Sequence, residues 1–274
     1  MEALNRGDPI PDSIRSGMEE LCDQAARQGS RLWIDAEQQV LQDTIDAWTI
    51  DLMRKYNRNG NVVVYNTIQA YLKASAQNVQ KHATLAAQEG WGLGIKLVRG
   101  AYIAHDIRSR IHDTKEDTDS NYDSIVSRLL TKNFPLPLTP EQKEQGIKFP
   151  DVRLFVATHN APSVKQAYAL YRSRINNGEP TIPVEFGQLQ GMADEISCEL
   201  VSQANKVHSS NKAAGSEVDP APMAFKCLAW GTTTDCIHFL LRRAVENKGA
   251  VQRTKHMAAA LRKEVWRRLF RSAH

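Results

Sequence analysis

The amino-acid sequence predicts an α/β protein built as a (β/α)8 barrel. Short apolar segments alternate with amphipathic segments at least six times, as parallel strands and crossover helices do. No change in composition marks a linker, and the 274 residues are close to the roughly 250 residues of such a barrel. A doubly wound open sheet is the alternative, but the glycine-rich phosphate-binding turn that usually follows its first strand is absent. The barrel is therefore preferred.

The first half of the chain contains three predicted strands and the helices that connect them. Ser13 is a suitable N-cap, and apolar side chains recur every three or four residues after it. β-branched residues fill the middle of the second strand, and Gly90 closes the long Ala- and Gln-rich helix. The expected strands lie within 31–37, 61–66 and 94–102, and the expected helices are 13–28, 40–57 and 68–89.

The second half continues the alternation after a polar stretch that contains one helix and a proline-rich loop. Pro162 lies near the start of a helix, where its missing N–H does no harm. The expected strands are 152–158, 182–186 and a weaker one at 224–229. The expected helices are 122–132, 162–176, a segment ending at 206, 234–247 and 253–270.

Composition sets broad limits on what the protein does. Hydrophobic residues make up 42% and charged residues 24%, which is ordinary for a globular protein. The four cysteines are scattered, which indicates a reducing compartment and no disulfide framework. The N-terminus does not resemble a targeting peptide, and no apolar run is long enough to span a bilayer.

The positive charge is concentrated at the C-terminus. From Leu241 onward there are ten Lys or Arg and two acidic residues, which gives +8 and leaves −4 for the rest of the +4 total. A surface for nucleic acid or acidic lipid is one interpretation, and a solvated terminal helix is the other.

Polar side chains follow the predicted strands at their carboxyl ends. Active sites of barrels are built at that end, so these side chains are candidates for a ligand site, although each could also be a turn or cap residue. They are Asp35, Glu37, Asn66, Arg99–Tyr102, Thr158–Asn160 and Gln188.

Two basic features stand out by themselves. Lys96 lies within an apolar strand, where it either extends to the rim of the sheet or meets an anion. Arg242 and Arg243 are adjacent on a predicted helix, with Glu246 in reach of either. Paired guanidinium groups suit a carboxylate or phosphate, whereas a surface salt bridge would contribute little.

Metal and serine-nucleophile chemistry are disfavoured. Asp35, Glu37 and His159 could converge, but no His-x-His or Glu-x-x-His spacing supports a metal site, and none is expected. No nucleophile-elbow sequence is present for a Ser-His-Asp triad.

Taken together, the motifs resemble those of FAD-dependent proline dehydrogenases of the eukaryotic mitochondrial type. The resemblance covers nearly the whole chain, and six segments occur in the family's order. They are Ile34–Glu37, Ile68–Tyr71, Lys96–Tyr102, Ala157–Asn160, Phe186–Met192 and Leu241–Asn247. It implies a distorted, TIM-like (β/α)8 barrel, formed by residues 1–274 as one domain, that holds FAD without a dinucleotide-binding motif.

The resemblance also implies roles for individual residues. Asp35, Lys96 and Tyr102 would be catalytic, Lys96 as a cation near the reactive end of the flavin. The proline pocket would be completed by Leu189, Arg242 and Arg243, the two arginines holding the substrate carboxylate. FAD would also be contacted by Gln69, Val98, Gly100, Ala101, Thr118, Thr158, His159, Asn160 and Glu246.

The implied reaction is oxidation of L-proline to Δ1-pyrroline-5-carboxylate, with hydride transfer to FAD and electrons passed to a quinone at a membrane surface. This is mitochondrial proline catabolism toward glutamate, at the inner membrane or its matrix side. No nucleic-acid partner is expected.

The sequence departs from the family's pattern at three places. No strand precedes Leu32, so the barrel is expected to lack its first strand and the lysine that the family carries there. Phe239 and Cys227 stand where the family usually has tyrosines, and Ala229 where it has proline. These changes raise an alternative, a catalytically impaired paralogue or fragment that binds flavin or a partner.

Overall fold

The computed structural model describes residues 2–214, 221–246 and 250–270; the side chains of residues 210–214, 242–246, 250–258 and 260 lie outside the description. Six parallel strands form one sheet in chain order, from β1 to β6. The strands are β1 (Leu32–Ile34), β2 (Val64–Gln69), β3 (Leu93–Val98), β4 (Val152–Ala157), β5 (Val184–Leu189) and β6 (Met223–Cys227).

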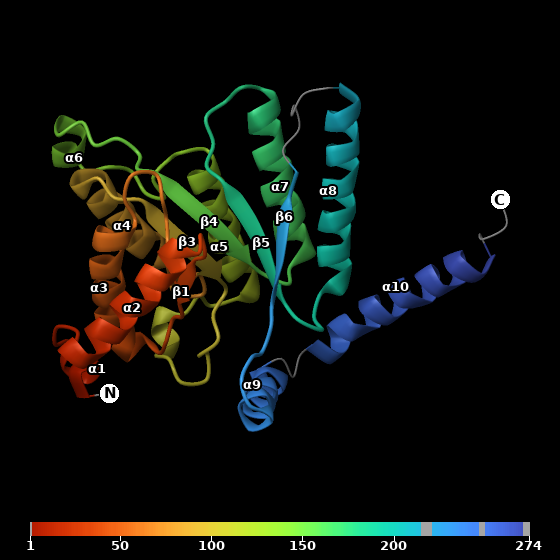
Figure 1. Cartoon of the computed structure of the whole chain (residues 1–274), viewed down its shortest axis with the longest axis horizontal. Coiled ribbons are helices and arrows are strands. Elements are labelled where there is room, and N and C mark those ends of the chain that lie inside the picture. The colour runs from red at the N-terminus through yellow and green to blue at the C-terminus, as the bar shows by residue number, and fades with distance from the viewer. Residues whose placement is uncertain (1, 215–220, 247–249, 271–274) are drawn as a thin grey trace.

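Helices connect consecutive strands and cover one face of this curled sheet (Figure 1). Two further helices precede β1, and two follow β6. The α-helices are α1 (Glu2–Arg6), α2 (Asp12–Arg27), α3 (Gln39–Tyr56), α4 (Ser75–Glu89), α5 (Lys115–Leu130), α6 (Pro140–Glu144), α7 (Ala161–Asn176), α8 (Asp194–Ala214), α9 (Thr233–Glu246) and α10 (Ala250–Phe270). A short 3-10 turn, Arg108–Arg110, interrupts the chain after β3.

The two faces of the sheet have different compositions because side chains alternate along each strand. On the outer face, strand residues such as Ile95, Leu154 and Phe186 are almost fully buried against the helices and form the main core. On the inner face, the register places Thr67 beside Lys96, and Lys96 beside Phe155. The sheet itself therefore separates inner-face side chains such as Lys96 from the packing core.

The sheet of the described residues has two edges, β1 and β6, and is not a closed eight-stranded barrel. Residues 2–31 contain α1, α2 and loops but no strand, as the sequence predicts. The α/β class and the parallel order are confirmed, and the observed architecture is a curled half-barrel of six strands.

Three predicted helix boundaries are wrong. The helix expected over 122–132 is α5, which begins at Lys115, and the helix expected to end at 206 is α8, which continues to Ala214. The helix expected from Ile68 begins only at Ser75, and β2 instead continues through Gln69. Ile68 and Gln69 pair in register with Leu97 and Val98 of β3, so sheet formation overrides the local helical pattern. Gln69 is thereby placed on the sheet.

The C-terminal helices lie apart from the helices that flank the sheet. In Figure 1, α9 lies below β6, at the end where the strands terminate, and α10 runs away from the body of the molecule. No helix among the described residues is long and apolar enough to cross a membrane.

Candidate active site

The centre of the candidate site is an ion pair on the inner face. Lys96 Nζ lies 2.5 Å from Asp35 Oδ1, although the two residues are far apart in the sequence. The Lys96 side chain is 23% exposed and the Asp35 side chain 77%. The cation therefore sits between a buried strand and the open rim, and it meets an anion, which was one of the two interpretations of its place in the sequence.

Gln69 connects the loops after β1 and β3 to the end of β2. Its Nε2 donates to the carbonyl oxygen of Glu37 at 3.0 Å, and its Oε1 accepts from the Ala101 amide at 3.2 Å. Val98, in register with Gln69, ends β3 on the same inner face. Three predicted cofactor residues are thus brought together by strand pairing and one amide side chain.

Arg99, a strand-end candidate without an assigned role, links the end of β3 to α5, to α7 and to the residue after β4. Its guanidinium group donates to Asp119 Oδ1 (2.6 Å), Thr158 Oγ1 (2.6 Å) and Ser163 Oγ (2.9 Å). It also lies over the buried ring of Tyr122, 4.4 Å from its centroid. Burial by itself would raise the pKa of Asp119, but the hydrogen bonds from Lys115 and Arg99 outweigh it and lower this pKa.

The Thr158 hydroxyl has a defined orientation as a result. A hydroxyl has one hydrogen and two acceptor lone pairs. Thr158 Oγ1 accepts from Arg99 and, at 3.1 Å, from the backbone N–H of Asn160. With both lone pairs used, the hydroxyl hydrogen is left to donate to another group.

Residues at the ends of β4 and β5 complete this side of the site. His159 Nε2 accepts from the Leu189 amide at 3.1 Å, which ties the two strand ends together. The side chain of Asn160 caps α7 by accepting from the Ser163 amide at 3.2 Å. Because His159 Nε2 accepts this hydrogen bond, Nε2 carries no hydrogen in this arrangement.

Tyr102 and Gly100 lie in the loop that follows β3. Tyr102 is half-buried, and its carbonyl oxygen accepts from the amides of His105 and Asp106. Gly100 has a φ of +137°, a conformation that disfavours other residues. This loop follows the strand that carries Lys96.

Some predicted residues lie elsewhere. Thr118 is buried in α5 and its hydroxyl donates to Thr114 O at 3.3 Å, within its own helix. Asn66 and Gln188 point to the helices instead of the inner face: Asn66 donates to Asp46 of α3, and Gln188 accepts from Ser197 of α8.

The predicted arginine pair belongs to the C-terminal part of α9. Arg242, Arg243 and Glu246 belong to α9, but their side chains lie outside the described residues. The helix itself lies at the carboxyl ends of the strands (Figure 1). Cys227 is exposed at the end of β6, and Phe239 is half-buried on α9.

An aromatic cluster that the sequence did not reveal lines the inner face near the amino ends of the strands. Trp33 contacts Tyr65 and Phe155, with ring centroids 5.7 and 5.3 Å apart, and Phe155 contacts Phe225 at 5.8 Å. Arg31 lies 5.4 Å from the Trp33 centroid and forms an ion pair with Glu185. We call this set the inner floor: Arg31, Trp33, Tyr65, Phe155, Glu185 and Phe225.

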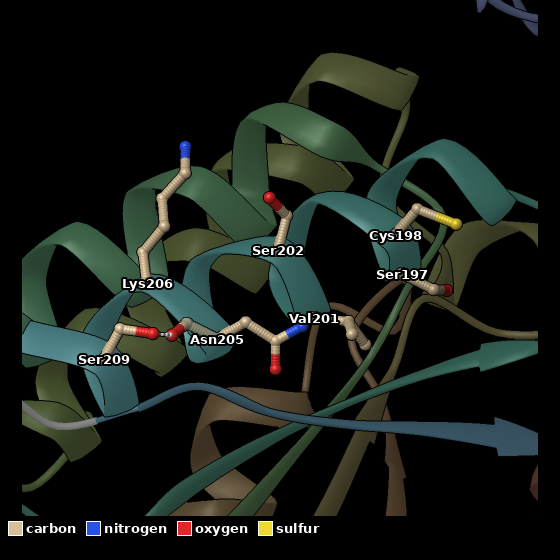
Figure 2. A pocket seen from close by; sticks show the side chains of 7 residues that line it. All are labelled: Ser197, Cys198, Val201, Ser202, Asn205, Lys206 and Ser209. Atoms are coloured by element: carbon tan, nitrogen blue, oxygen red, sulfur yellow. Dashed lines mark hydrogen bonds between the residues drawn. The ribbon is translucent and has the colours of Figure 1, made fainter. Parts of the chain in front are cut away.

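One hollow of the described structure lies away from the candidate site. It has a volume of about 810 Å³ and runs along α8, and all seven lining residues belong to that helix (Figure 2). None of them was predicted for the site. This hollow is an open face of one helix. The arrangement of side chains at the strand ends therefore identifies the site better than the volume of this hollow does.

A family model described as proline dehydrogenase matches residues 6–256. The chain is 34% identical over 256 residues to a probable mitochondrial proline dehydrogenase of Schizosaccharomyces pombe, covering 92% of this chain and 49% of that one. The human mitochondrial proline dehydrogenase 1 is 32% identical over 262 residues (92% and 38%), and a mouse hydroxyproline dehydrogenase 33% over 243 residues (87% and 48%).

Solved structures agree on the fold. Proline utilization A from Bdellovibrio bacteriovorus, inactivated by N-propargylglycine, superposes with a TM-score of 0.63 at 19% identity, over 85% of this chain and 22% of that one. Another proline utilization A, with proline bound in remote sites, gives 0.56 at 22% identity, over 84% and 21%. The chain spans half or less of the length of these three curated relatives.

Proposed function

Because this chain belongs to the proline dehydrogenase family, we propose that it oxidises L-proline to Δ1-pyrroline-5-carboxylate as an FAD-dependent oxidoreductase. The observation that carries the proposal is the Lys96–Asp35 pair on the inner face, because it joins two family motifs at the strand ends. We further propose that residues 1–274 act as one domain and that the half-barrel belongs to a distorted (β/α)8 barrel.

The inner face has polar groups that suit a flavin. Lys96 offers a cation on this face. At the end of β4, the Thr158 hydroxyl has its hydrogen available to a ligand. Two buried polar atoms of this face, Trp33 Nε1 and Thr67 Oγ1, have no hydrogen-bond partner within the described residues. Since buried polar atoms are normally paired, this face has the capacity to bind a polar ring system, and FAD fits it.

The cofactor would be held by the residues that the family motifs indicate. When bound, FAD would accept the hydride that leaves proline, which carries both electrons of the oxidation. Lys96 would supply a positive charge that stabilises the negative charge of the reduced ring. The groups that contact FAD would be Gln69, Val98, Gly100, Ala101, Thr158, His159, Asn160 and Glu246.

The substrate would be positioned from α9 and the loops. Arg242 and Arg243 would bind the proline carboxylate through paired, geometrically fixed hydrogen bonds. Asp35, Tyr102 and Leu189 would line the rest of the pocket. Orientation of the donor carbon against the cofactor is the main contribution of the protein, because hydride transfer depends on close approach.

We also propose a quinone acceptor at a membrane surface, in the mitochondrion. Several relatives are named as mitochondrial proline dehydrogenases. The α10 helix supports a surface location because large apolar side chains on it are 52–69% exposed and alternate with arginines, a combination that suits a lipid interface. Those side chains are Leu261, Val265, Trp266, Leu269 and Phe270.

Two other functions have specific support. Hydroxyproline dehydrogenases of mouse, rat and cattle match at 30–33% identity, so 4-hydroxyproline is a second candidate substrate. Phe239 and Cys227 remove two phenols from positions near the pocket, which favours the alternative of an impaired paralogue or fragment that binds flavin or a partner.

The test is anaerobic reduction of the purified flavoprotein. L-Proline should bleach the flavin absorbance, and a soluble ubiquinone analogue should restore it. Faster bleaching by trans-4-hydroxy-L-proline would favour the second substrate. Bound flavin that neither compound reduces would favour the impaired paralogue, and a folded chain without flavin affinity would overturn the proposal.

A further inference from the structure

The loop after β3 has few apolar contacts of its own to fix its position. Ala101, Ile103 and His105 are exposed, Ile103 by 64%. Ordering such a loop costs conformational entropy that only contacts from neighbouring elements can offset. Tyr102 lies in the middle of it, so its placement requires an external support.

We propose that Tyr71, which follows β2, is a positioning residue for Tyr102. Its ring packs against the loop 99–106, and its hydrogen bond to Asp106 fixes Tyr102 in the proline pocket. Tyr71 is only 4% exposed, and it lies in the strand-end motif Ile68–Tyr71 without having been assigned a role.

The backbone amide and the ring of Tyr71 both anchor the beginning of the loop. The Tyr71 amide donates to the Arg99 carbonyl at 2.7 Å. A Cβ placed on Gly100 would lie 1.8 Å from Tyr71 Cδ1, so the ring occupies the space that a side chain would need. Together with the φ of +137°, this makes glycine necessary at position 100.

The hydroxyl of Tyr71 anchors the end of the loop. It donates to Asp106 Oδ2, while Asp106 Oδ1 accepts from the Gln39 amide at the start of α3 (2.8 Å). The Asp106 amide in turn donates to the Tyr102 carbonyl at 2.9 Å. Tyr71 therefore connects the start of α3, the loop after β3 and the backbone of Tyr102.

A direct contact between the two tyrosines supports the same arrangement. Burial raises the pKa of Tyr71, and the hydrogen bond to Asp106 raises it further, whereas a hydrogen bond from the backbone of Tyr102 acts in the opposite direction. The Tyr71 hydroxyl therefore lies near the backbone of Tyr102 as well as Asp106.

The proposal rests on the proposed function only for its kinetic part. Tyr71→Phe keeps the ring and removes the hydroxyl, and Tyr171→Phe, at a half-buried tyrosine on α7, is the control. Hydrogen exchange of the His105 and Asp106 amides should become about tenfold faster in Tyr71→Phe, because a charge-assisted hydrogen bond is lost. The KM for L-proline should rise about tenfold and kcat should change less than about twofold, as expected when a binding contact is displaced.

A second pair of variants tests whether the bond to Asp106 is responsible. Asp106→Asn should reproduce part of the effect, and Tyr71→Phe/Asp106→Asn should be no worse than Tyr71→Phe by itself. Unchanged exchange in Tyr71→Phe would overturn the anchoring of the loop. Faster exchange with an unchanged KM would overturn the role in the pocket. Wild-type protein that oxidises no proline would count against the proposed function, and the exchange data would still decide whether Tyr71 holds the loop.

Discussion

At the scale of single residues, Lys96 is the most informative position. A lysine inside an apolar strand requires an anion or access to solvent, and Lys96 has both because Asp35 pairs with it at the rim. A single cation, Lys96, therefore serves both the Asp35 carboxylate and the proposed flavin side of the site.

Replacing Lys96 by methionine should slow proline-dependent flavin reduction about 100-fold, because preorganised charge at the reacting group is lost. Stopped-flow absorbance of the flavin measures this rate. Lys73→Met is the matched control, since Lys73 forms an exposed pair with Asp113 at 3.3 Å. Equal reduction rates in Lys96→Met and wild type would contradict the assigned role.

Thr158 offers a separate test that involves no charge change. Thr158→Val removes the hydroxyl but keeps the shape, and FAD affinity should fall about tenfold because one donor to the ligand is lost. Thr158→Ser retains that donor and should bind FAD nearly as the wild type does. Titration of the apoprotein by flavin fluorescence gives both constants, and equal affinity of the valine variant would exclude Thr158 as a donor.

At the scale of secondary-structure elements, a buried polar cluster joins α3, β2 and α4. The Asp46 carboxylate accepts from Gln42, Asn66 and Asn78, each at 2.7 Å. His82 is 1% exposed, and its Nε2 lies 3.9 Å from Asp46. Burial lowers the pKa of His82, and the nearby Asp46 carboxylate opposes this only in part.

This cluster predicts a pH dependence of stability. The folded chain binds the His82 proton less readily than the unfolded chain, whose histidine pKa is about 6.5. The stabilisation is therefore complete above that pH and is lost as the pH falls below it. Between pH 7.5 and 5.5 the wild type should lose about 1 kcal/mol more free energy of unfolding than His82→Leu. Urea titrations measure it, with the exposed His208→Leu as control, and parallel pH profiles would refute the assignment.

The inner floor is the second element-scale feature. The Arg31 and Glu185 side chains are only 24% and 15% exposed, so each charge depends on the other. Arg31→Met should reduce the free energy of unfolding by about 2 kcal/mol, because Glu185 is left buried without its partner. Arg31→Met/Glu185→Met should recover part of that loss. A double variant as unstable as the sum of the singles would show that the pair is not coupled.

At the scale of the whole molecule, the six strands and their helices share one continuous core. If residues 1–274 form one domain, urea should unfold the chain in a single transition. Far-UV circular dichroism and tryptophan fluorescence should then give the same midpoint. Two separate midpoints would indicate that the C-terminal helices and the sheet unfold independently.

The sequence predicted the architecture well where apolar periodicity was strong. β3 and β4 follow their apolar runs closely. Lys96 and Asp35 are far apart in the sequence, and only the register of β1, β2 and β3 brings them together. Their pairing with each other was not foreseen for that reason.

Other features could not be read from the chain because they depend on side-chain direction. Asn66 and Gln188 end apolar strands like true site residues, yet both point to the helices, since alternate strand positions face opposite sides. The inner floor joins residues from five strands, and no local pattern marks it. The Tyr71 support likewise requires the folded loop.

Trp33 gives the inner face an optical reporter. Its ring belongs to the inner floor, on the same face as Lys96 and within contact distance of Phe155, the register partner of Lys96. Oxidised flavins absorb where tryptophan emits, so a flavin beside Lys96 would drain the excited state of Trp33 by resonance energy transfer. With the other four tryptophans changed to phenylalanine, the emission lifetime of Trp33 would time the arrival of the cofactor, before any substrate is added.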